Sequence, residues 1–487
     1  MTLRKALAWS VSGQFSAAAI TFGGSVVVAR LLSPRDLGVY AVAAAIITVI
    51  NTTAAFGVST YVIRAKELLP TTLSSAFTLN GILASAVALL IFGVSVAQRD
   101  LFRADAIARV LAPLALVPLI AIFEFRPSVM LQRDMNFRML GLISGGKALC
   151  ANVFVIALAL DGFSYMSLAY GSLASSLFSA AAACLVGRRH IGFALSLAEA
   201  RQMTGFGIKM MSVGGINTLA ARLSDIILGN LLGLAALGLY SRASNLSSQI
   251  FDNVYGAITR VLFVQLSAEY RGRGVLRDVF LRGFEMITAL IWPMQIGLAV
   301  LAGPAISILY GQKWLSAALP LSLLMCAQFV VVCFGMNWEL FVLRNETSRM
   351  ARFELARAVV GVGAFSIGCL VSISCAAVGR VAESLFGLAL FLPHMTRIAG
   401  TEPGELTRIY LRSAALTCVA VAPSVLLMIE SGWSPRTPPL AIAGTILLGI
   451  ALWASLLWVQ DHPVLAEIKL LARKARSRMP GAASNAA

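Results

Sequence analysis

The stretch LLSPRDLGVY, residues 31–40, returns two hundred residues later as LLGLAALGLY, residues 231–240. The two copies share five of ten positions, including the Leu-Gly pairs at 37–38 and 237–238 and the tyrosines at 40 and 240. Leucine-rich sequences match by chance easily, whereas an internal duplication would constrain the whole architecture. A second match is therefore needed to choose between these two interpretations.

A second pair of similar segments favours duplication. RDMNFRM, residues 133–139, and RNETSRM, residues 344–350, both contain an arginine, four residues and then Arg-Met. Each segment follows the fourth predicted membrane span of its half of the chain. Because a chance match would have no reason to occur at corresponding positions, we interpret the chain as an internal duplication.

The composition is that of a membrane protein. The chain has 487 residues, of which 59% are hydrophobic and only 13% are charged, whereas about a quarter are charged in soluble proteins. Residues 37–63 and 68–98 contain no Asp, Glu, Lys or Arg, and about 20 apolar residues suffice for a helix to cross a bilayer. The sequence therefore predicts an all-α polytopic membrane protein.

Fourteen spans are predicted. They are residues 8–30, 37–62, 73–97, 106–128, 138–160, 164–186, 206–230, 238–263, 282–304, 315–340, 353–375, 377–394, 411–430 and 438–459. Two hundred residues cover six spans, an even number, so both copies of the first motif face the same side. This predicts parallel six-helix repeats related by an axis along the membrane normal.

The duplication also predicts how the chain is divided. The N-terminal lobe comprises spans 1–6 in residues 1–187, and a cytoplasmic linker follows at 188–205. Spans 7–12 form the C-terminal lobe in residues 206–395, and spans 13–14 occupy residues 396–460. Residues 461–487 form a basic cytoplasmic tail.

The net charge of +17 is explained by membrane orientation rather than by nucleic acid. With the N-terminus inside, every cytoplasmic connection carries at least two basic residues, whereas most outer connections carry none or one. This bias is the positive-inside rule. The sequence predicts a multi-pass membrane protein with both termini in the cytoplasm and no nucleic-acid partner.

Residues 31–40 themselves are predicted to form a helix–turn–helix at the outer surface. Ser33 is suited to cap the second helix, Pro34 to its first turn, and Asp36 to the helix N-terminus. In the second copy Gly233 provides the break without a cap. A tight turn explains this spacing without any ligand.

Several segments resemble a known family. They are ARLLSPRDLGVYAVAAAI (29–46), AFGVSTYVIR (55–64), VMLQRDMNFRM (129–139), DIILGNLLGLAALGLYSRASNL (225–246) and LYGQKWLSAALPLSLL (309–324). They are similar to the polysaccharide transporters, the Wzx-type oligosaccharide flippases of the multidrug/oligosaccharidyl-lipid/polysaccharide flippase superfamily. The resemblance covers roughly residues 8–395 and implies fourteen helices in two bundles around a cationic cavity. It also implies a location in the bacterial inner membrane and passage of undecaprenyl-diphosphate-linked oligosaccharide to its outer leaflet, for exopolysaccharide, capsule or lipopolysaccharide.

Ionisable residues inside the spans are the candidate functional groups, because a charge near the bilayer centre costs at least about 2.5 kcal/mol. Lys147 lies about nine residues into its span and Asp252 lies mid-span. Four cations are expected to line the cavity and bind diphosphate and acidic sugars by charge-assisted hydrogen bonds. These cations are Arg30, Lys147, Arg222 and Arg260.

A carboxylate is expected to take the coupling ion, a proton or sodium, and the candidates are Asp225 and Asp252. Arg222 and Asp225 are three residues apart on one helix face and could instead be a structural pair. Arg30 could reach water at the outer end of its span. The same alternative applies to residues near cytoplasmic ends: Glu124, Arg126, Arg260, Glu285, Glu339 and Arg357.

The predicted mechanism is alternating access, in which the lobes rock and the polyprenyl tail stays in lipid. The expected partners are the lipid-linked oligosaccharide, membrane lipids and polysaccharide polymerase or export machinery. A drug–cation antiporter of the same superfamily is the alternative, although such a protein would favour a neutral or acidic cavity.

An enzyme is not predicted, because the outer connections are short and no phosphate-binding loop occurs. No cofactor or metal is expected, since the seven cysteines show no metal-ligand spacing.

Overall fold

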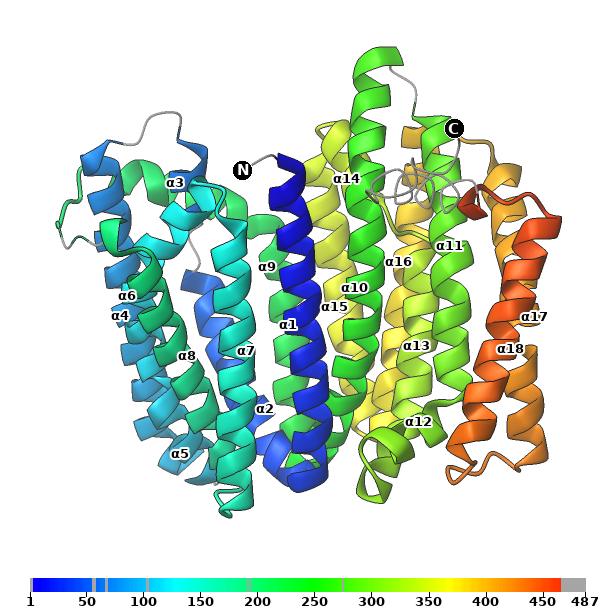
Figure 1. Ribbon diagram of the computed structural model, residues 1–487, viewed down its shortest axis with the longest axis horizontal. Helices are drawn as coiled ribbons and strands as arrows, with labels where there is room; N and C mark the ends of the chain where they lie inside the picture. Colours follow the sequence, from blue (N-terminus) through cyan, green and yellow to red (C-terminus); the bar gives the residue numbers. More distant parts are fainter. Residues whose placement is uncertain are drawn as a thin grey trace, which may run out of the picture. The chain divides into compact units, whose positions relative to one another are not determined.

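The computed structural model describes residues 3–465 except 55–57, 66–68, 102–104, 191, 193 and 274–275, and all elements of this part are helices (Figure 1). The chain divides into two compact units, Met1–Ser241 and Arg242–Ala487, which are described separately. The predicted all-α architecture is confirmed.

The first unit contains nine α-helices, one short 3-10 helix and the beginning of a tenth α-helix. Their bounds are α1 Leu3–Leu31, α2 Pro34–Ala54, α3 Val58–Arg64, α4 Pro70–Leu101, α5 Asp105–Leu114, α6 Leu116–Arg133, α7 Phe137–Leu160, α8 Met166–Val186, η1 Arg188–His190, α9 Ala200–Leu231 and α10 Leu234–Arg273. In this unit α1 lies along α7, and α7 along α8 (Figure 1).

The second unit begins within α10 and contains the remaining helices. Their bounds are α11 Arg277–Val300, α12 Ala302–Leu309, η2 Gln312–Ala317, α13 Ala318–Val332, α14 Asn337–Leu343, α15 Thr347–Cys369, α16 Ile373–Ala399, α17 Pro403–Glu430 and α18 Pro439–Val459. Within it α17 packs against α11, and α18 packs against α17.

Ten segments of the described chain are long and apolar enough to cross a membrane, and each falls on one of the fourteen predicted spans. The other four predictions fall on α1, α9, α10 and α15, which have 29, 32, 40 and 23 residues. These four helices are long enough to span a bilayer but contain more polar residues. The count of fourteen stays a prediction.

The two units repeat the same pattern of helix packing. In the first unit α4 packs against α6, α6 against α8, and α7 against α8. In the second unit the corresponding pairs are α11 with α13, α13 with α16, and α15 with α16. The same three packed pairs thus recur in both units, as an internal duplication predicts.

Both copies of the first motif are tight turns between helices, as predicted. The Asp36 N–H donates to the Ser33 hydroxyl at 3.2 Å, and the Asp36 carboxylate accepts from the Ser33 N–H at 3.0 Å. This reciprocal pair is a capping box. In the second copy Gly233 has a φ of +89°, a conformation that glycine adopts at little cost.

The two turns also contact each other through their glycines. A Cβ on Gly38 would lie 1.7 Å from the carbonyl oxygen of Leu234, and a Cβ on Gly238 would lie 1.8 Å from that of Pro34. The contact is reciprocal, since residues 34 and 234 occupy the same place in the two copies. Glycine is required at both positions because the backbones touch where a side chain would begin.

The second pair of similar segments needs a correction. The Asn136 N–H donates to the Leu131 carbonyl, and the Glu346 N–H donates to the Phe341 carbonyl, both at 2.9 Å. The turns therefore correspond at an offset of 210 residues, whereas the letters match at 211. The helix–turn–helix is repeated, but the Arg-x-x-x-x-Arg-Met letters do not occupy equivalent positions.

Candidate functional site

Lys147 lies on α7 inside the first unit, within reach of one carboxylate. Its Nζ is 4.0 Å from Glu124 Oε2 of α6, and its side chain is 45% exposed. The Ser179 hydroxyl of α8 donates to the other Glu124 oxygen at 2.7 Å. This contact is long for an ion pair, so Lys147 keeps donors for a further anion.

Arg357 is the counterpart of Lys147 in the second unit. Lys147 comes ten residues after Phe137, the first residue of α7, and Arg357 comes ten residues after Thr347, the first residue of α15. Because the turns before these two helices are equivalent, the repeat places a cation at the same point of each unit. The sequence analysis missed this correspondence, which a one-residue change of register would have revealed.

Arg357 differs from Lys147 in its environment. Its guanidinium contacts Glu354 at 2.8 Å and Glu383 at 3.4 Å, and its side chain is only 16% exposed. Arg380 contacts Glu383 at 2.7 Å and lies over the Phe365 ring. Two arginines and two glutamates therefore neutralise each other, and this four-charge cluster holds α15 against α16.

Arg222 and Asp225 form the predicted pair on α9, 2.9 Å apart, with 41% and 15% of their side chains exposed. Arg30 is exposed in the last turn of α1, and Asp252 is exposed on α10. Arg260 belongs to α10, but its side chain lies outside the described residues. The structure thus joins Arg222 to Asp225 and places Lys147 beside Glu124.

Three residues for which contact with water at a helix end was an alternative are largely buried. Glu339 is 8% exposed, and the side chains of Arg357 and Glu285 are 16% and 15% exposed. The heads of Arg357 and Glu285 form ion pairs within the protein and Glu339 is buried, so that interpretation is wrong for these three residues. Their burial depends on neighbouring helices that the sequence does not identify.

Arg242 is a buried cation that sequence reasoning missed. It lies on α10 with 7% of its surface exposed. Its guanidinium carbon is 5.1 Å from the ring centre of Tyr310 and 5.6 Å from that of Trp314. Cation–π contacts of this kind stabilise a charge away from water. They attach α10 to the segment that connects α12 with α13.

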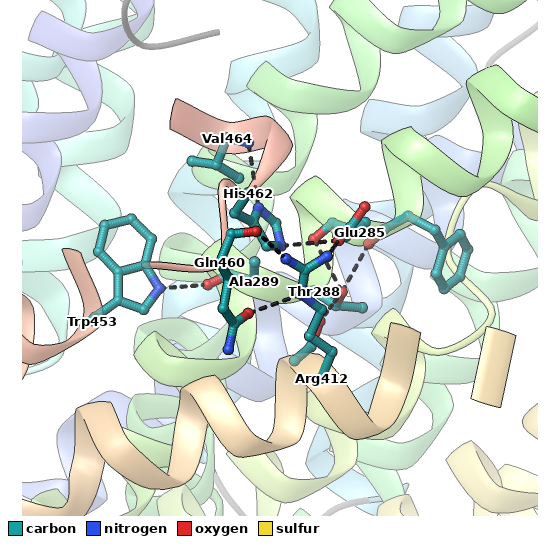
Figure 2. A network of polar contacts seen from close by, with 10 residues as sticks. Glu285, Thr288, Ala289, Arg412, Trp453, Gln460, His462 and Val464 are labelled. Atoms are coloured by element: carbon teal, nitrogen blue, oxygen red, sulfur yellow. Dashed lines mark hydrogen bonds and ion pairs between the residues drawn. The ribbon is translucent and has the colours of Figure 1, made fainter. Parts of the chain in front are cut away.

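A polar network joins α11, α17 and the end of α18 in the second unit (Figure 2). Arg412 donates to Glu285 Oε1 at 2.6 Å. It also donates to the side-chain oxygen of Gln460 at 2.8 Å and to its backbone carbonyl at 2.7 Å. Three donors of one guanidinium thus connect α17 to α11 and to the end of α18.

His462 completes this network and is 1% exposed. The Val464 N–H donates to its Nδ1 at 3.3 Å, so Nδ1 is unprotonated, and Nε2 lies 3.4 Å from Glu285 Oε1 (Figure 2). Burial and the neighbouring Arg412 lower the pKa of His462 to about 4. Glu285 does not reverse this effect, because its charge is already compensated by Arg412. The imidazole is therefore neutral at pH 7.

Comparison with known proteins gives consistent matches. A sequence family described as "Polysaccharide biosynthesis protein" matches residues 27–319. The chain is 26% identical over 378 residues to the succinoglycan biosynthesis transport protein ExoT of Rhizobium meliloti strain 1021, covering 76% of this chain and 75% of that one. It is 24% identical over 302 residues to the lipopolysaccharide biosynthesis protein WzxC of Escherichia coli K12, covering 62% and 61%.

Two solved structures show the same fold. The lipid II flippase MurJ in an inward closed conformation has a TM-score of 0.73 and 12% identity, covering 94% of this chain and all of that one. An inward-facing multidrug resistance transporter of the MATE family has a TM-score of 0.61 and 16% identity, covering 79% and 94%. At these identities the likeness concerns the fold alone.

Proposed function

Because the chain belongs to the polysaccharide biosynthesis protein family, we propose that it flips undecaprenyl-diphosphate-linked oligosaccharide across the bacterial inner membrane. Relatives named for succinoglycan transport and lipopolysaccharide biosynthesis support this substrate class. The product would enter exopolysaccharide, capsule or lipopolysaccharide assembly, together with a polymerase or export machinery. The proposed orientation has both termini in the cytoplasm, as the distribution of basic residues indicates.

The environment of Lys147 is the observation that best supports binding of a diphosphate. A diphosphate needs cationic donors that are not already neutralised, and Lys147 has one long contact and a half-exposed side chain. Arg357, at the equivalent point of the other repeat, is enclosed between two carboxylates. The two repeats have thus diverged toward a binding cation in one unit and a structural cation in the other.

The remaining cations and carboxylates predicted from the sequence would bind the substrate or the coupling ion. Arg30 and Arg222 would add donors for the diphosphate or acidic sugars, and Arg260 would do the same from α10. Asp225 is held by Arg222, which disfavours it as the group that exchanges an ion. Asp252 is exposed on α10. Of the two carboxylates that the sequence suggested for the coupling ion, it is the one without an ion pair to any side chain that the structure describes. Alternating access of the two units would carry the headgroup while the tail stays in lipid.

A deletion strain tests the function. We expect loss of the surface polysaccharide and accumulation of lipid-linked oligosaccharide whose sugars are accessible only from the cytoplasmic side of membrane vesicles. The wild-type gene should restore both properties. A deletion strain with normal surface polysaccharide and altered sensitivity to cationic dyes would instead indicate a drug antiporter.

Complementation of the deletion strain with Lys147 variants tests whether Lys147 binds the diphosphate. Loss of a hydrogen bond to a charged group costs about 1.5–3 kcal/mol, so Lys147→Ala should reduce flipping about tenfold to hundredfold. Lys147→Arg should retain most activity. Arg436→Ala is the matched control, because Arg436 is exposed between α17 and α18. Full activity of Lys147→Ala at equal expression would refute the assignment.

A further inference from the structure

The span Gln312–Leu343 is interrupted near one end. Helix α13 ends at Val332 and α14 begins at Asn337, with a turn between them in which Met336 has a φ of +58°. Lipid offers no hydrogen bonds to backbone groups freed by such a break. A non-helical segment at this depth therefore needs partners from the protein.

Two tyrosines supply these partners. The Tyr410 hydroxyl of α17 donates to the Cys333 carbonyl at 2.7 Å. The Met336 N–H donates to the Tyr255 hydroxyl of α10 at 2.6 Å. A Cβ on Gly335 would lie 2.9 Å from that same hydroxyl, so glycine allows Tyr255 to approach. The break between α13 and α14 is thus stabilised by hydrogen bonds from two other helices, α10 and α17.

Glu339 follows this break by three residues and is 8% exposed. The other buried carboxylates of this unit are paired: Glu285 with Arg412, and Glu354 and Glu383 with Arg357. No ion pair connects Glu339 to any Lys, Arg or His side chain that the structure describes. A buried ionised carboxylate without a cation is costly, so a neutral form is favoured.

We propose that Glu339 is the carboxylate that binds and releases the coupling proton of this transporter, an inference that rests on the proposed flippase function. A proton from the water on one side joins a carboxylate oxygen to give the neutral acid. It leaves to the water on the other side when Glu339 becomes hydrated. Neither Asp225, held by Arg222, nor the exposed Asp252 combines burial with an uncompensated charge.

The groups on the surrounding helices leave Glu339 as the charge that changes. Helix α14 packs against α15 and α16, which carry Glu354, Arg357, Arg380, Glu383 and His394, and the turn before it contacts Tyr255 of α10 and Tyr410 of α17. The arginines and glutamates in this set are paired with one another. Protonation of Glu339 therefore removes a negative charge that no described cation pairs with.

A proton fits this site better than a metal cation. Cations such as Na⁺ and Ca²⁺ are bound by several oxygens, and six to eight are usual for Ca²⁺. The described residues contain no group of three His, Cys, Asp or Glu side chains close enough to share an ion. Among the described side chains of α10, Tyr255 lies near Glu339, and its hydroxyl already accepts the Met336 N–H.

The break between α13 and α14 would connect protonation of Glu339 to a change in conformation. A neutral Glu339 remains buried beside the turn, whereas an ionised one requires water. Discontinuous membrane helices are places where transporters bind coupling ions and change conformation. The protonation state of Glu339 would select between a closed and a hydrated arrangement of the α13–α14 turn.

Infrared spectroscopy tests protonation without requiring transport. The full chain in lipid nanodiscs is titrated with acid and base, and the carboxylic-acid C=O band is recorded. Wild type minus Glu339→Gln should contain one protonated carboxyl signal at neutral pH. The matched control Glu430→Gln, which removes an exposed carboxylate at the far end of α17, should lack it. Absence of that signal in the Glu339→Gln difference would overturn the inference.

Transport under a pH gradient tests coupling. Proteoliposomes would contain a fluorescent polyprenyl-diphosphate-linked sugar as probe, and its leaflet distribution would be read by impermeant quenching. One pH unit should shift the wild-type distribution up to about tenfold if one proton moves per cycle, whereas Glu339→Gln should flip independently of the gradient. Gradient-driven flipping by Glu339→Gln, or a response to sodium instead of pH, would overturn the inference. Wild type that fails to flip the probe would contradict the proposed function, leaving the infrared result to stand separately.

Discussion

Arg357 and Lys147 show how the neighbours of a cation decide whether its charge is neutralised within the protein or left available. Both stand ten residues into equivalent helices. Arg357 meets two carboxylates in a fork geometry that suits guanidinium. Lys147 meets one carboxylate at 4.0 Å. The same position of the repeat therefore serves packing in one unit and leaves a charge available in the other.

At the residue scale, Arg357→Met should destabilise the second unit. Removing one member of a buried ion pair leaves its partners uncompensated, which costs about 3–5 kcal/mol. We expect a clearly lower thermal unfolding midpoint in nanodiscs. Arg277→Met is the matched control, because Arg277 contacts Glu405 in a partly exposed pair and such pairs contribute little. Equal midpoints for the two variants would contradict the structural role of Arg357.

His462 makes a pH-dependent contribution to stability. Its pKa is about 4 in the folded protein against an ordinary value of 6.5, so the unfolded chain binds more protons between these values. Stability is therefore fully present above pH 6.5 and is lost as the pH falls toward 4. Between pH 7 and pH 5 the loss from this group is about 2 kcal/mol.

Thermal unfolding at pH 7 and pH 5 measures this contribution. In His462→Asn the side-chain oxygen still accepts the Val464 N–H, but no proton is taken up, so the difference between the two midpoints should shrink. His190→Asn, which changes a partly exposed histidine, should behave as wild type. An unchanged pH dependence in His462→Asn would show that the imidazole is not the titrating group.

At the element scale, the helix–turn–helix at residues 31–40 owes its geometry to local chemistry and to a distant contact. Ser33 and Asp36 cap the start of α2, and this capping was predictable from the letters alone. The approach of the two turns was not, because it depends on where the second copy lies. The glycines were visible as matching letters without their steric reason.

Gly38→Ala tests this contact. The new methyl would meet the Leu234 carbonyl oxygen at 1.7 Å, and such overpacking costs about 1–3 kcal/mol. Gly23→Ala provides the comparison, since nothing lies within 4 Å of its Cβ in α1 and alanine is favoured over glycine in helices by about 1 kcal/mol. Unfolding midpoints should therefore move in opposite directions, and a stable Gly38→Ala would contradict the close approach.

The second repeat signal illustrates what letters cannot supply. The matching Arg-x-x-x-x-Arg-Met letters identified the correct turn, but they align the two copies one residue away from the alignment given by the turn hydrogen bonds. Turn geometry is set by backbone hydrogen bonds and not by these side chains. The error concealed the equivalence of Lys147 and Arg357. The burial of Glu339 without an ion pair to any described side chain and the burial of Arg242 were also beyond sequence reasoning, since both depend on which helices pack beside them.

At the scale of the whole molecule, composition and the absence of charge over long stretches were sufficient to predict a polytopic helical protein. The ten apolar spans agree with the prediction. The helices α9, α10 and α15 were harder to assign, because they combine spanning length with the charged residues that provide candidate sites. Charged residues within a span therefore weaken the membrane signal of that span.

The orientation can be tested by cysteine labelling in intact cells. Arg35→Cys is exposed in the first turn of α2, and Ser348→Cys is exposed in the first turn of α15. A membrane-impermeant maleimide that reaches the periplasm should label Arg35→Cys directly and Ser348→Cys only after permeabilisation. The wild-type chain corrects for its native cysteines. The reverse pattern would invert the proposed topology.

The reciprocal glycine contact limits how independently the two halves of the gene can evolve. Gly38 approaches the backbone of the second copy and Gly238 approaches that of the first, so a larger residue at either position separates both turns at once. No single compensating side chain can relieve the clash, because the opposing atoms are carbonyl oxygens of the main chain. Divergence elsewhere is free to assign different roles to Lys147 and Arg357. At residues 38 and 238 a viable lineage would have to keep glycine in both copies together, as a trace of the original duplication.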